Sequence, residues 1–320
     1  MLKNNNIKDF KFNFKNKVAI VTGASTGLGF EISKYFLKYG ASLIICSSNS
    51  KNIRKAFNEL KKLIKNNQKI FYKTTDVSSS KQIKDLIKFS FKKFRKIDIL
   101  VNNAGIYGPK GNIETVNWND WIKTIEVNLF GSVLLCKSLI PHFKKNKKGK
   151  IIQLSGGGAA SPVPNISGYA VSKAGIVRFV ENLSSELKGF NIDINAVAPG
   201  AVNTNMLNEV LKAGPKKIGS YYYKKALIQK KEGGSPIKKA CDLVLFLASK
   251  YSNGINGKLL SALWDDWKNL PSHKDILKKS DIFSIRRITA KDRGFLWGQT
   301  SNKSNYDRSL APLGLFKKKR

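Results

Sequence analysis

Seven short apolar runs alternate with segments of helical period between residues 17 and 267. Most of these runs show no polar alternation, which is typical of strands covered on both faces of a parallel sheet. In the segments between them, apolar residues recur every three or four positions and Lys lies on the outer faces. This pattern predicts one doubly wound, Rossmann-type α/β domain with a seven-stranded parallel sheet. The expected strands are residues 18–21, 43–46, 70–72, 97–101, 151–154, 192–197 and 259–260.

Two segments flank the expected domain of residues 17–267. Residues 1–16 form a polar arm, and residues 268–320 form a basic extension that ends in Lys317-Lys318-Lys319-Arg320. The extension is too short and too polar for a core of its own, so we expect it to pack on the domain or to be partly disordered. No run of 18 apolar residues and no signal peptide is recognisable. We therefore expect a cytoplasmic protein without a membrane partner.

The net charge is unusual, because 58 basic residues against 21 acidic ones give +37. Such a surplus is found in nucleic-acid-binding proteins. However, only eight of the 58 are Arg, whereas phosphate and base recognition draws heavily on the Arg side chain. The Lys surplus also accompanies abundant Asn and Ile, as AT-rich coding sequence produces, so we do not expect a nucleic-acid partner. Cys46, Cys136 and Cys241 are widely spaced in apolar runs, so they indicate neither a disulfide nor a metal site.

A glycine-rich turn follows the first expected strand and opens a helical stripe. Glycines let the backbone approach a diphosphate closely, and the free N–H groups and dipole of the next helix face the phosphates. The spacing is G-x3-G-x-G rather than the usual G-x-G-x-x-G, and no Gly-Lys-Ser/Thr closes the run, which excludes a P-loop. At this place in an α/β sheet the turn predicts a dinucleotide site, built from Gly23, Ser25, Thr26, Gly27, Leu28 and Gly29.

Three further turns are expected on the same rim, where the carboxyl ends of the strands bind ligands in open α/β sheets. After the third strand, Asp76 and Val77 are suited to the adenine. After the fourth, Asn102, Ala104 and Gly105 allow close approach to a ribose. After the sixth, Pro199, Gly200, Val202 and Thr204 are suited to the nicotinamide carboxamide. Each could be an ordinary turn, but four turns of matching chemistry on one edge favour a bound cofactor.

A second group of residues carries acid–base chemistry. Tyr169 and Lys173 are four positions apart, so they share one face of a helix, and Ser155 ends the preceding strand. A phenol with a pKa near 10 is a poor acid at neutral pH, but a nearby ammonium lowers that pKa at about 1.4 kcal/mol per unit. The Ser155 hydroxyl is placed to hold a substrate oxygen. Alone, Tyr-x-x-x-Lys is a weak signal in a Lys-rich chain.

Together these motifs, in this order and spacing, resemble the classical short-chain dehydrogenase/reductase family over residues 17 to about 263. The resemblance implies NAD(P)-dependent hydride transfer between the nicotinamide and a small carbonyl or secondary alcohol. It implies that Tyr169 is the general acid in reduction and the base in oxidation, and that Lys173 lowers its pKa and binds the nicotinamide ribose. It also implies that Ser155 orients the substrate and that Asn128 holds a water of a proton relay.

The chain departs from the family pattern where the second strand ends. Relatives that prefer NAD usually carry Asp there, whereas this chain has Ser47, Ser48 and Asn49. Without that carboxylate a 2′-phosphate is not repelled, and Lys51 or Arg54 adds positive charge. We therefore predict NADP as the cofactor. NAD remains possible because no basic residue lies in the glycine turn or at Ser48.

The substrate stays open among a sugar or sugar nucleotide, a 3-oxoacyl thioester on an acidic carrier protein, and another small ketone. Trp264 and Trp267 flank two carboxylates near the substrate mouth and either stack on a sugar or, as we favour, anchor the extension or a subunit interface. Residues 205–236 are expected to form a lid. Its Tyr221-Tyr222-Tyr223 run serves either the substrate or packing.

Relatives pair through helices that correspond to residues 118–147 and 169–187, which predicts a homodimer or homotetramer. Two other classes of function share this scaffold: a basic nucleic-acid-associated protein and a regulatory protein that senses the reduced cofactor. The intact Asn128, Ser155, Tyr169 and Lys173 set argues against both.

Overall fold

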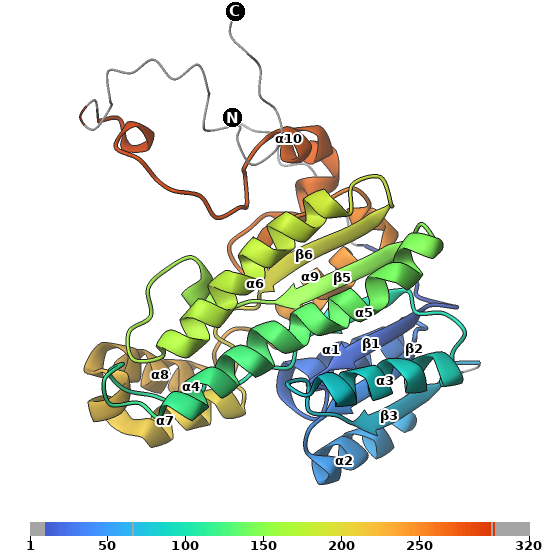
Figure 1. Ribbon diagram of the computed structural model, residues 1–320, viewed down its shortest axis with the longest axis horizontal. Coiled ribbons are helices and arrows are strands. Elements are labelled where there is room, and N and C mark those ends of the chain that lie inside the picture. Colours follow the sequence, from blue (N-terminus) through green and yellow to red (C-terminus); the bar gives the residue numbers. More distant parts are fainter. Residues whose placement is uncertain (1–9, 66, 296, 298–320) are drawn as a thin grey trace, which may run out of the picture.

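In the computed structural model, residues 10–65, 67–295 and 297 are described, and they contain one seven-stranded parallel sheet in the order β3-β2-β1-β4-β5-β6-β7 (Figure 1). Every expected strand is confirmed, and so is the doubly wound α/β class. The register places Val21 of β1 between Ile45 of β2 and Val101 of β4. The strands are β1 (Val18–Thr22), β2 (Ser42–Ser47), β3 (Ile70–Thr74), β4 (Ile99–Asn102), β5 (Gly149–Leu154), β6 (Ile192–Ala198) and β7 (Leu259–Ser261).

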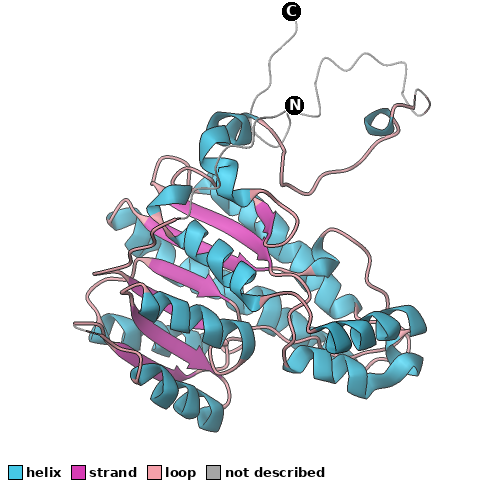
Figure 2. Ribbon diagram, turned by 180° about the vertical axis from the view of Figure 1, so that it is seen from behind, coloured by secondary structure: helices cyan, strands magenta, loops and turns pink. Residues whose placement is uncertain are grey.

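Helices cover both faces of this sheet (Figure 2). Alternate residues of each strand point to opposite faces, so Ala19 and Val21 pack under α1, α2 and α9, whereas Val18 and Ile20 pack under α3, α5 and α6. The helices are α1 (Gly27–Lys38), α2 (Ser50–Lys61), α3 (Ser80–Lys93), α4 (Trp118–Ile125), α5 (Gly131–Lys145), α6 (Ser167–Glu186), α7 (Asn205–Ile218), α8 (Ser220–Glu232), α9 (Ile237–Ala248) and α10 (Lys274–Lys279).

The described part of the N-terminal arm packs on the domain, which differs from the polar arm expected. Phe14 is only 1% exposed, and its ring lies 5.1 Å from that of Phe36 in α1. Phe10 and Phe12 are partly buried against the same core. The backbone N–H of Phe14 also donates to the Tyr39 carbonyl at 2.7 Å. Lys and Asn residues alternate with these three Phe residues, so the arm has a polar composition although its aromatic rings pack on the core.

The C-terminal extension closes the edge of the sheet at β7, as far as the structure describes it. The backbone N–H of Leu259 donates to the Phe283 carbonyl at 2.8 Å. The buried ammonium of Lys258 donates to the carbonyls of Ser280 and Ile282 at 3.1 and 2.9 Å. Residues 268–285 therefore pack on the domain, whereas residues 286–295 are mostly exposed. The basic cluster at 317–320 lies outside the described residues.

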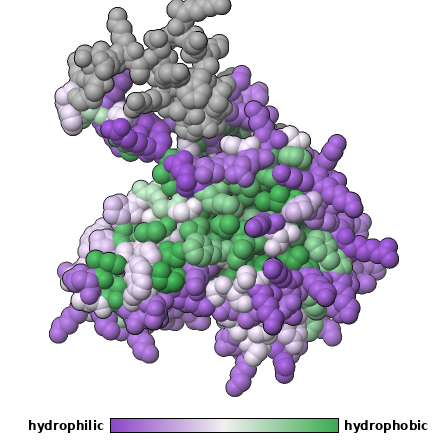
Figure 3. All heavy atoms as spheres, in the orientation of Figure 1, coloured by the Kyte–Doolittle hydropathy of each residue, from purple (hydrophilic) through white to green (hydrophobic). Residues whose placement is uncertain are grey.

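One broad apolar face is left uncovered on the outside of α4, α5 and α6 (Figure 3). Trp118, Phe130 and Val171 are 61%, 52% and 51% exposed there. The stretch Trp118–Lys145 is apolar and long enough to cross a membrane by length and composition, a test that core helices also pass. Its inner side packs on the sheet through Leu135, Leu139 and Phe143.

Candidate active site

The glycine-rich turn joins β1 to α1 and touches the segment that follows β4. Gly23 has φ +62°, and a Cβ there would lie 2.8 Å from the Cα of Ala104, so only glycine fits. The side-chain amide of Asn103 donates to the carbonyls of Thr22 and Gly23 at 3.0 and 3.1 Å. Asn103 thus fastens the two turns together, a role that its place in the Asn-Asn-Ala-Gly run could have indicated.

Asn102, expected beside the cofactor ribose, directs its side chain into the domain instead. It ends β4, is 3% exposed, and donates to the Ser132 carbonyl of α5 at 3.2 Å. Side chains alternate along a strand, so the residue before the turn points to the core while Ala104 and Gly105 lie on the rim. The Asn102 side chain therefore holds α5 on the sheet, and the expected contact of Asn102 with the cofactor stays a prediction that only its backbone could fulfil.

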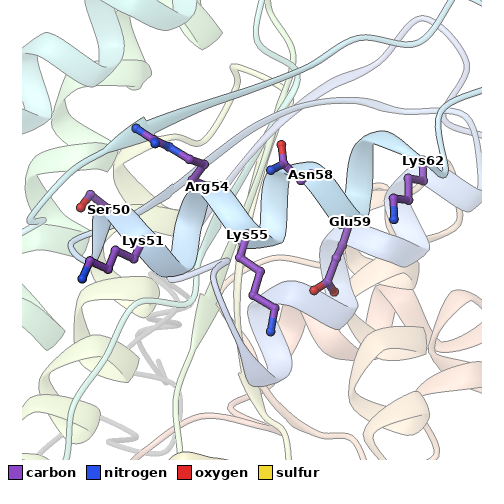
Figure 4. Close-up of a pocket in the computed structure, with 7 residues that line it drawn as sticks. All are labelled: Ser50, Lys51, Arg54, Lys55, Asn58, Glu59 and Lys62. Carbon is purple, nitrogen blue, oxygen red and sulfur yellow. The ribbon is translucent and has the colours of Figure 1, made fainter.

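The end of β2 presents hydroxyl groups and no carboxylate. Ser25 of the glycine turn donates to the Ser47 hydroxyl at 3.0 Å, and Ser48 is exposed next to it. Lys51 and Arg54 follow on the exposed face of α2 (Figure 4). The seven residues drawn in Figure 4 line a hollow of about 590 Å³, and among the described residues all of its lining belongs to α2 or is Lys62, so the hollow is an open helix face. Positive charge is nevertheless available beside Ser48.

Asp76 follows β3 and is held in its charged form. Its carboxylate accepts hydrogen bonds from the backbone and hydroxyl of Ser78 at 2.9 and 2.7 Å and from the Lys123 ammonium at 3.2 Å. Partial burial alone would raise its pKa, but the bonds from Ser78 and Lys123 lower it below the usual value. Val77, next in the chain, is buried against α5.

Tyr169, Lys173 and Ser155 meet where β5 ends against the start of α6. A Cβ at Gly156 would collide with the Tyr169 hydroxyl, so this glycine lets the phenol reach the turn that carries Ser155. The Lys173 ammonium donates to the Leu154 carbonyl at 2.8 Å and lies 5.6 Å from the centroid of the Tyr169 ring. Ser155 and Lys173 are 3% and 5% exposed, so water is largely excluded from both.

Asn128 lies in a π-helical turn, Glu126–Phe130, between α4 and α5. Its side chain accepts from the backbone N–H of Ile106 at 2.8 Å and donates to the Ile106 carbonyl and the Ser172 hydroxyl, both at 2.9 Å. It therefore connects the loop after β4 to α6. Gly105 lies between Asn128 and Lys173. A Cβ added at Gly105 would lie 3.3 Å from the Asn128 side-chain oxygen and 3.5 Å from the Lys173 ammonium.

The protonation of this group differs from the expectation that Lys173 lowers the pKa of Tyr169. Burial raises the pKa of Tyr169 above its ordinary value, and the neighbouring Tyr222 raises it further. Burial also lowers the pKa of Lys173 to about 8. The reason is that both groups have lost water, and the Lys173 ammonium is bonded to Leu154 rather than to the phenol. The Tyr169 hydroxyl thus keeps its proton at neutral pH.

Helices α7 and α8 cover the group, at the position expected for a lid (Figure 1). The Tyr107 ring lies 4.7 Å from that of Tyr169, and Tyr222 of α8 belongs to the same apolar cluster. Burial raises the pKa of Tyr107. In the Tyr221-Tyr222-Tyr223 run the first residue is 72% exposed and the other two are partly buried. Tyr107 was not among the expected site residues, although it follows the Asn-Asn-Ala-Gly run at the mouth of the site.

Gly27 faces the loop that follows β6. A Cβ at Gly27 would lie 3.2 Å from the methyl group of Thr204. The hollow between them has a volume of about 320 Å³ and is lined by Gly27, Asn203, Thr204, Asn205, Leu207, Asn208 and Lys230. The glycine turn, the turn after β6 and the start of α1 therefore form a cradle that fits the diphosphate of a dinucleotide.

Trp264 and Trp267 have separate environments. Trp267 is 6% exposed and packs on Phe246 and Phe10, with ring centroids 5.4 and 6.5 Å away, so it anchors the extension and the arm. Trp264 is 86% exposed. The two carboxylates between them accept hydrogen bonds from nearby residues of the same segment. Asp265 accepts from the backbone N–H of Ser261, and Asp266 accepts from the side-chain amide of Asn269, both at 2.6 Å. The described geometry therefore favours packing over a sugar site for Trp267.

Cys46, Cys136 and Cys241 are buried thiols, as expected, and burial raises the pKa of each to about 12. Across residues 10–65, 67–295 and 297 no three His, Cys, Asp or Glu side chains come together as a metal site.

Comparison with known proteins gives consistent matches. The short chain dehydrogenase family model matches residues 17–214. Dehydrogenase/reductase SDR family member 4 of Caenorhabditis elegans is 37% identical over 60% of this chain and 74% of its own length. A 3-oxoacyl-[acyl-carrier-protein] reductase FabG of Buchnera aphidicola is 34% identical over 76% and 94%. The crystal structure of an actinorhodin polyketide ketoreductase with NADPH superposes with a TM-score of 0.69 at 25% identity, covering 77% of this chain and 95% of that one.

Proposed function

Because the chain belongs to the short-chain dehydrogenase/reductase family, whose members are NAD(P)-dependent oxidoreductases, we propose that it reduces a small carbonyl compound to a secondary alcohol with NADP(H). One observation carries the proposal. The Tyr169 hydroxyl lies against Gly156 beside Ser155, and Lys173 reaches the carbonyl of Leu154 in the same buried corner. A general acid, a hydroxyl donor and a cation thus converge at the carboxyl end of β5.

The dinucleotide, when bound in the cradle at Gly27, supplies the hydride. Ser155 donates a hydrogen bond to the substrate oxygen and holds the carbonyl toward Tyr169. As the carbonyl carbon accepts the hydride, the Tyr169 hydroxyl gives its proton to the oxygen, and the product is the neutral alcohol. Lys173, with its pKa near 8, then returns a proton to the phenolate at neutral pH. In the oxidative direction the same groups remove the alcohol proton.

In this mechanism Asn128 holds the two sides of the catalytic site in place. Its amide joins Ile106 on one side of the cleft to Ser172 in α6 on the other, so it fixes the distance between the two walls. A water bound next to it would connect Lys173 to solvent and complete the proton relay that the family resemblance implies.

For the substrate we propose a carbonyl with an apolar or thioester-linked chain, of which a 3-oxoacyl thioester is the leading example. The walls beside Tyr169 are aromatic or aliphatic: Tyr107, Val163, Ile166, Leu207 and Tyr222 belong to one apolar cluster. Such walls bury a chain better than a sugar, whose hydroxyls need polar partners. The similarity to FabG and the +37 charge, which attracts an acidic carrier, support the same class.

The test of the catalytic assignment is Tyr169→Phe, with Tyr72→Phe on β3 as the matched control. Reduction of acetoacetyl-CoA by NADPH should fall about a hundredfold or more in the Tyr169 variant, because the proton donor is lost while the ring still packs. Binding of NADPH, followed by its fluorescence, should remain. Turnover above a few per cent of the wild-type value would contradict the role of Tyr169.

The test of the cofactor is a comparison of kcat/KM with NADPH and with NADH. We expect NADPH to be preferred, and we expect Ser48→Asp to reverse that preference by repelling the 2′-phosphate across the exposed end of β2. Asn58→Asp adds the same charge farther along α2 and should leave the preference almost unchanged. A tenfold preference of the wild-type protein for NADH would overturn the assignment of NADP.

A further inference from the structure

Lys230 brings a positive charge to the cradle at Gly27 from a distant part of the chain. The hollow there is lined by the glycine turn, by the loop and first turn of α7 that follow β6, and by a single residue of α8, which is Lys230. Among the described residues that line the hollow, Lys230 is the only charged one, because the others are neutral.

The last turns of α8 are fixed at this place by hydrogen bonds to the loop after β6. The side-chain amide of Gln229, the residue before Lys230, donates to the Ala201 carbonyl at 3.0 Å and to the Asn203 side chain at 3.1 Å. Just after α8, the backbone N–H of Ser235 donates to the same Ala201 carbonyl at 2.9 Å. The position of Lys230 beside Gly27 thus follows from specific bonds of its neighbours.

Nothing in the described protein neutralises this ammonium. Within the described residues, no carboxylate lies at ion-pair distance from Lys230. The glycine turn itself, residues 22–29, contains no Lys or Arg. A diphosphate bound in the cradle would otherwise be held by hydrogen bonds and the partial charge at the start of α1. The Lys230 ammonium at the hollow supplies the full positive charge that the glycine turn lacks.

A bland alternative is that Lys230 is a solvated residue in the last turn of α8, where cations are favourable next to the helix dipole. Lys231 shares that helical position, but it does not line the hollow. Substituting Lys230 and Lys231 one at a time therefore distinguishes an effect of the helix end from an effect of the cradle.

We propose that Lys230 on the lid binds the cofactor diphosphate, and that cofactor binding thereby fixes α8 over the substrate cleft. The inference rests on the proposed dinucleotide function. Tyr222 lies two turns earlier on α8, where it packs in one apolar cluster with Tyr107 and Tyr169. A bond between Lys230 and the diphosphate therefore ties the cofactor to the aromatic wall of the substrate site, so that the lid is ordered before the substrate is reduced.

The first experiment measures NADPH and NADH binding by fluorescence titration of the wild-type protein, Lys230→Gln, Lys230→Arg and Lys231→Gln. We expect Lys230→Gln to weaken both cofactors about tenfold, because one charge-assisted hydrogen bond is lost and the two cofactors share the diphosphate. Lys230→Arg should stay within about threefold of the wild type, and Lys231→Gln within about twofold. The loss in Lys230→Gln should shrink at high salt.

Each other outcome decides something specific. Unchanged affinities in Lys230→Gln overturn the proposal, as does equal weakening by Lys231→Gln. Weakening of NADPH alone would assign Lys230 to the 2′-phosphate instead of the diphosphate and would also overturn it. Failure of the wild-type protein to bind either cofactor would contradict the proposed function itself, which is a different result.

A second measurement follows the lid without using activity. Chymotrypsin cleaves after Tyr, so cuts at Tyr221, Tyr222 and Tyr223 report on α8 and are not altered by a Lys substitution. Saturating NADPH should slow these cuts several-fold in the wild-type protein and in Lys231→Gln, but little in Lys230→Gln. Equal protection in Lys230→Gln at saturation would show that cofactor binding fixes α8 without Lys230.

Discussion

The protonation of the residues around Tyr169 is set by burial more than by their mutual contacts. Asn128, Ser155 and Lys173 are all at most 5% exposed. Desolvation favours the neutral forms, so the pKa of Tyr169 rises and that of Lys173 falls. The residue types and their spacing could be predicted from the sequence, whereas the direction of the Tyr169 shift could not, because it depends on how completely neighbouring segments exclude water.

The buried charge of Lys173 should cost stability that a neutral side chain recovers. Its pKa of about 8 in the folded protein lies below the ordinary 10.5, so the protonated form destabilises the fold below pH 8, and this penalty fades as the pH rises from 8 toward 10.5. Lys173→Met should therefore be inactive yet more stable at pH 7, by about 1–2 kcal/mol after loss of the bond to Leu154. Urea denaturation at several pH values measures this.

Lys150 provides the matched control for that prediction. It is also buried, but its ammonium is paired with Asp193 at 2.7 Å. Lys150→Met leaves that carboxylate without its partner and should destabilise the protein by about 3 kcal/mol or more. Lys173 is not a destabilising desolvated cation if Lys173→Met is less stable than the wild-type protein at pH 7. The same holds if the gain in stability of Lys173→Met over the wild type does not shrink at higher pH.

At the scale of elements, the segments that flank the expected domain differ most from the sequence-based expectations. The polar composition of residues 10–16 concealed the pattern Phe10, Phe12, Phe14, which packs against α1 and α9. The described part of the extension covers β7, where an open edge would invite pairing with other chains. Both segments were hard to predict because their apolar residues are few and are buried by elements far away in the chain.

Phe14 tests whether the arm belongs to the core. Phe14→Ala removes a ring that is 1% exposed and should lower the free energy of unfolding by about 3–5 kcal/mol. Phe295→Ala, at a ring that is 54% exposed, should change it by less than about 0.5 kcal/mol. Chemical denaturation compares the two, and similar small effects would mean that the arm contributes little to the fold.

At the scale of the whole molecule, the positively charged side chains and the apolar surface lie on different faces. Lys side chains spread over outer helix faces such as that of α2, whereas the outside of α4, α5 and α6 stays apolar (Figures 3 and 4). An apolar face of this kind is typical of protein interfaces. The helices expected to pair subunits, residues 118–147 and 169–187, are those that carry it.

This face predicts association of identical chains. The wild-type protein should elute from size-exclusion chromatography with light scattering as a multiple of 35.7 kDa, and Phe130→Lys should shift it toward the single-chain mass. A cation at a position that is 52% exposed is tolerated in one chain but not against a second apolar face. Ile228→Lys, equally exposed on α8, is the control. A wild-type protein that is monomeric at micromolar concentration would contradict the interface.

The sequence by itself determined the features that depend on neighbours along the chain. The seven strands follow from short apolar runs, the turn at Gly23 from the backbone freedom of glycine, and the shared face of Tyr169 and Lys173 from the helical repeat. Tertiary structure alone decided which distant groups meet. Tyr107 and Tyr222 lie beside Tyr169, Phe14 is buried, and Lys230 reaches the glycine turn. These contacts, and the pKa values that burial sets, arise from packing between segments whose separation in the chain carries no local signal.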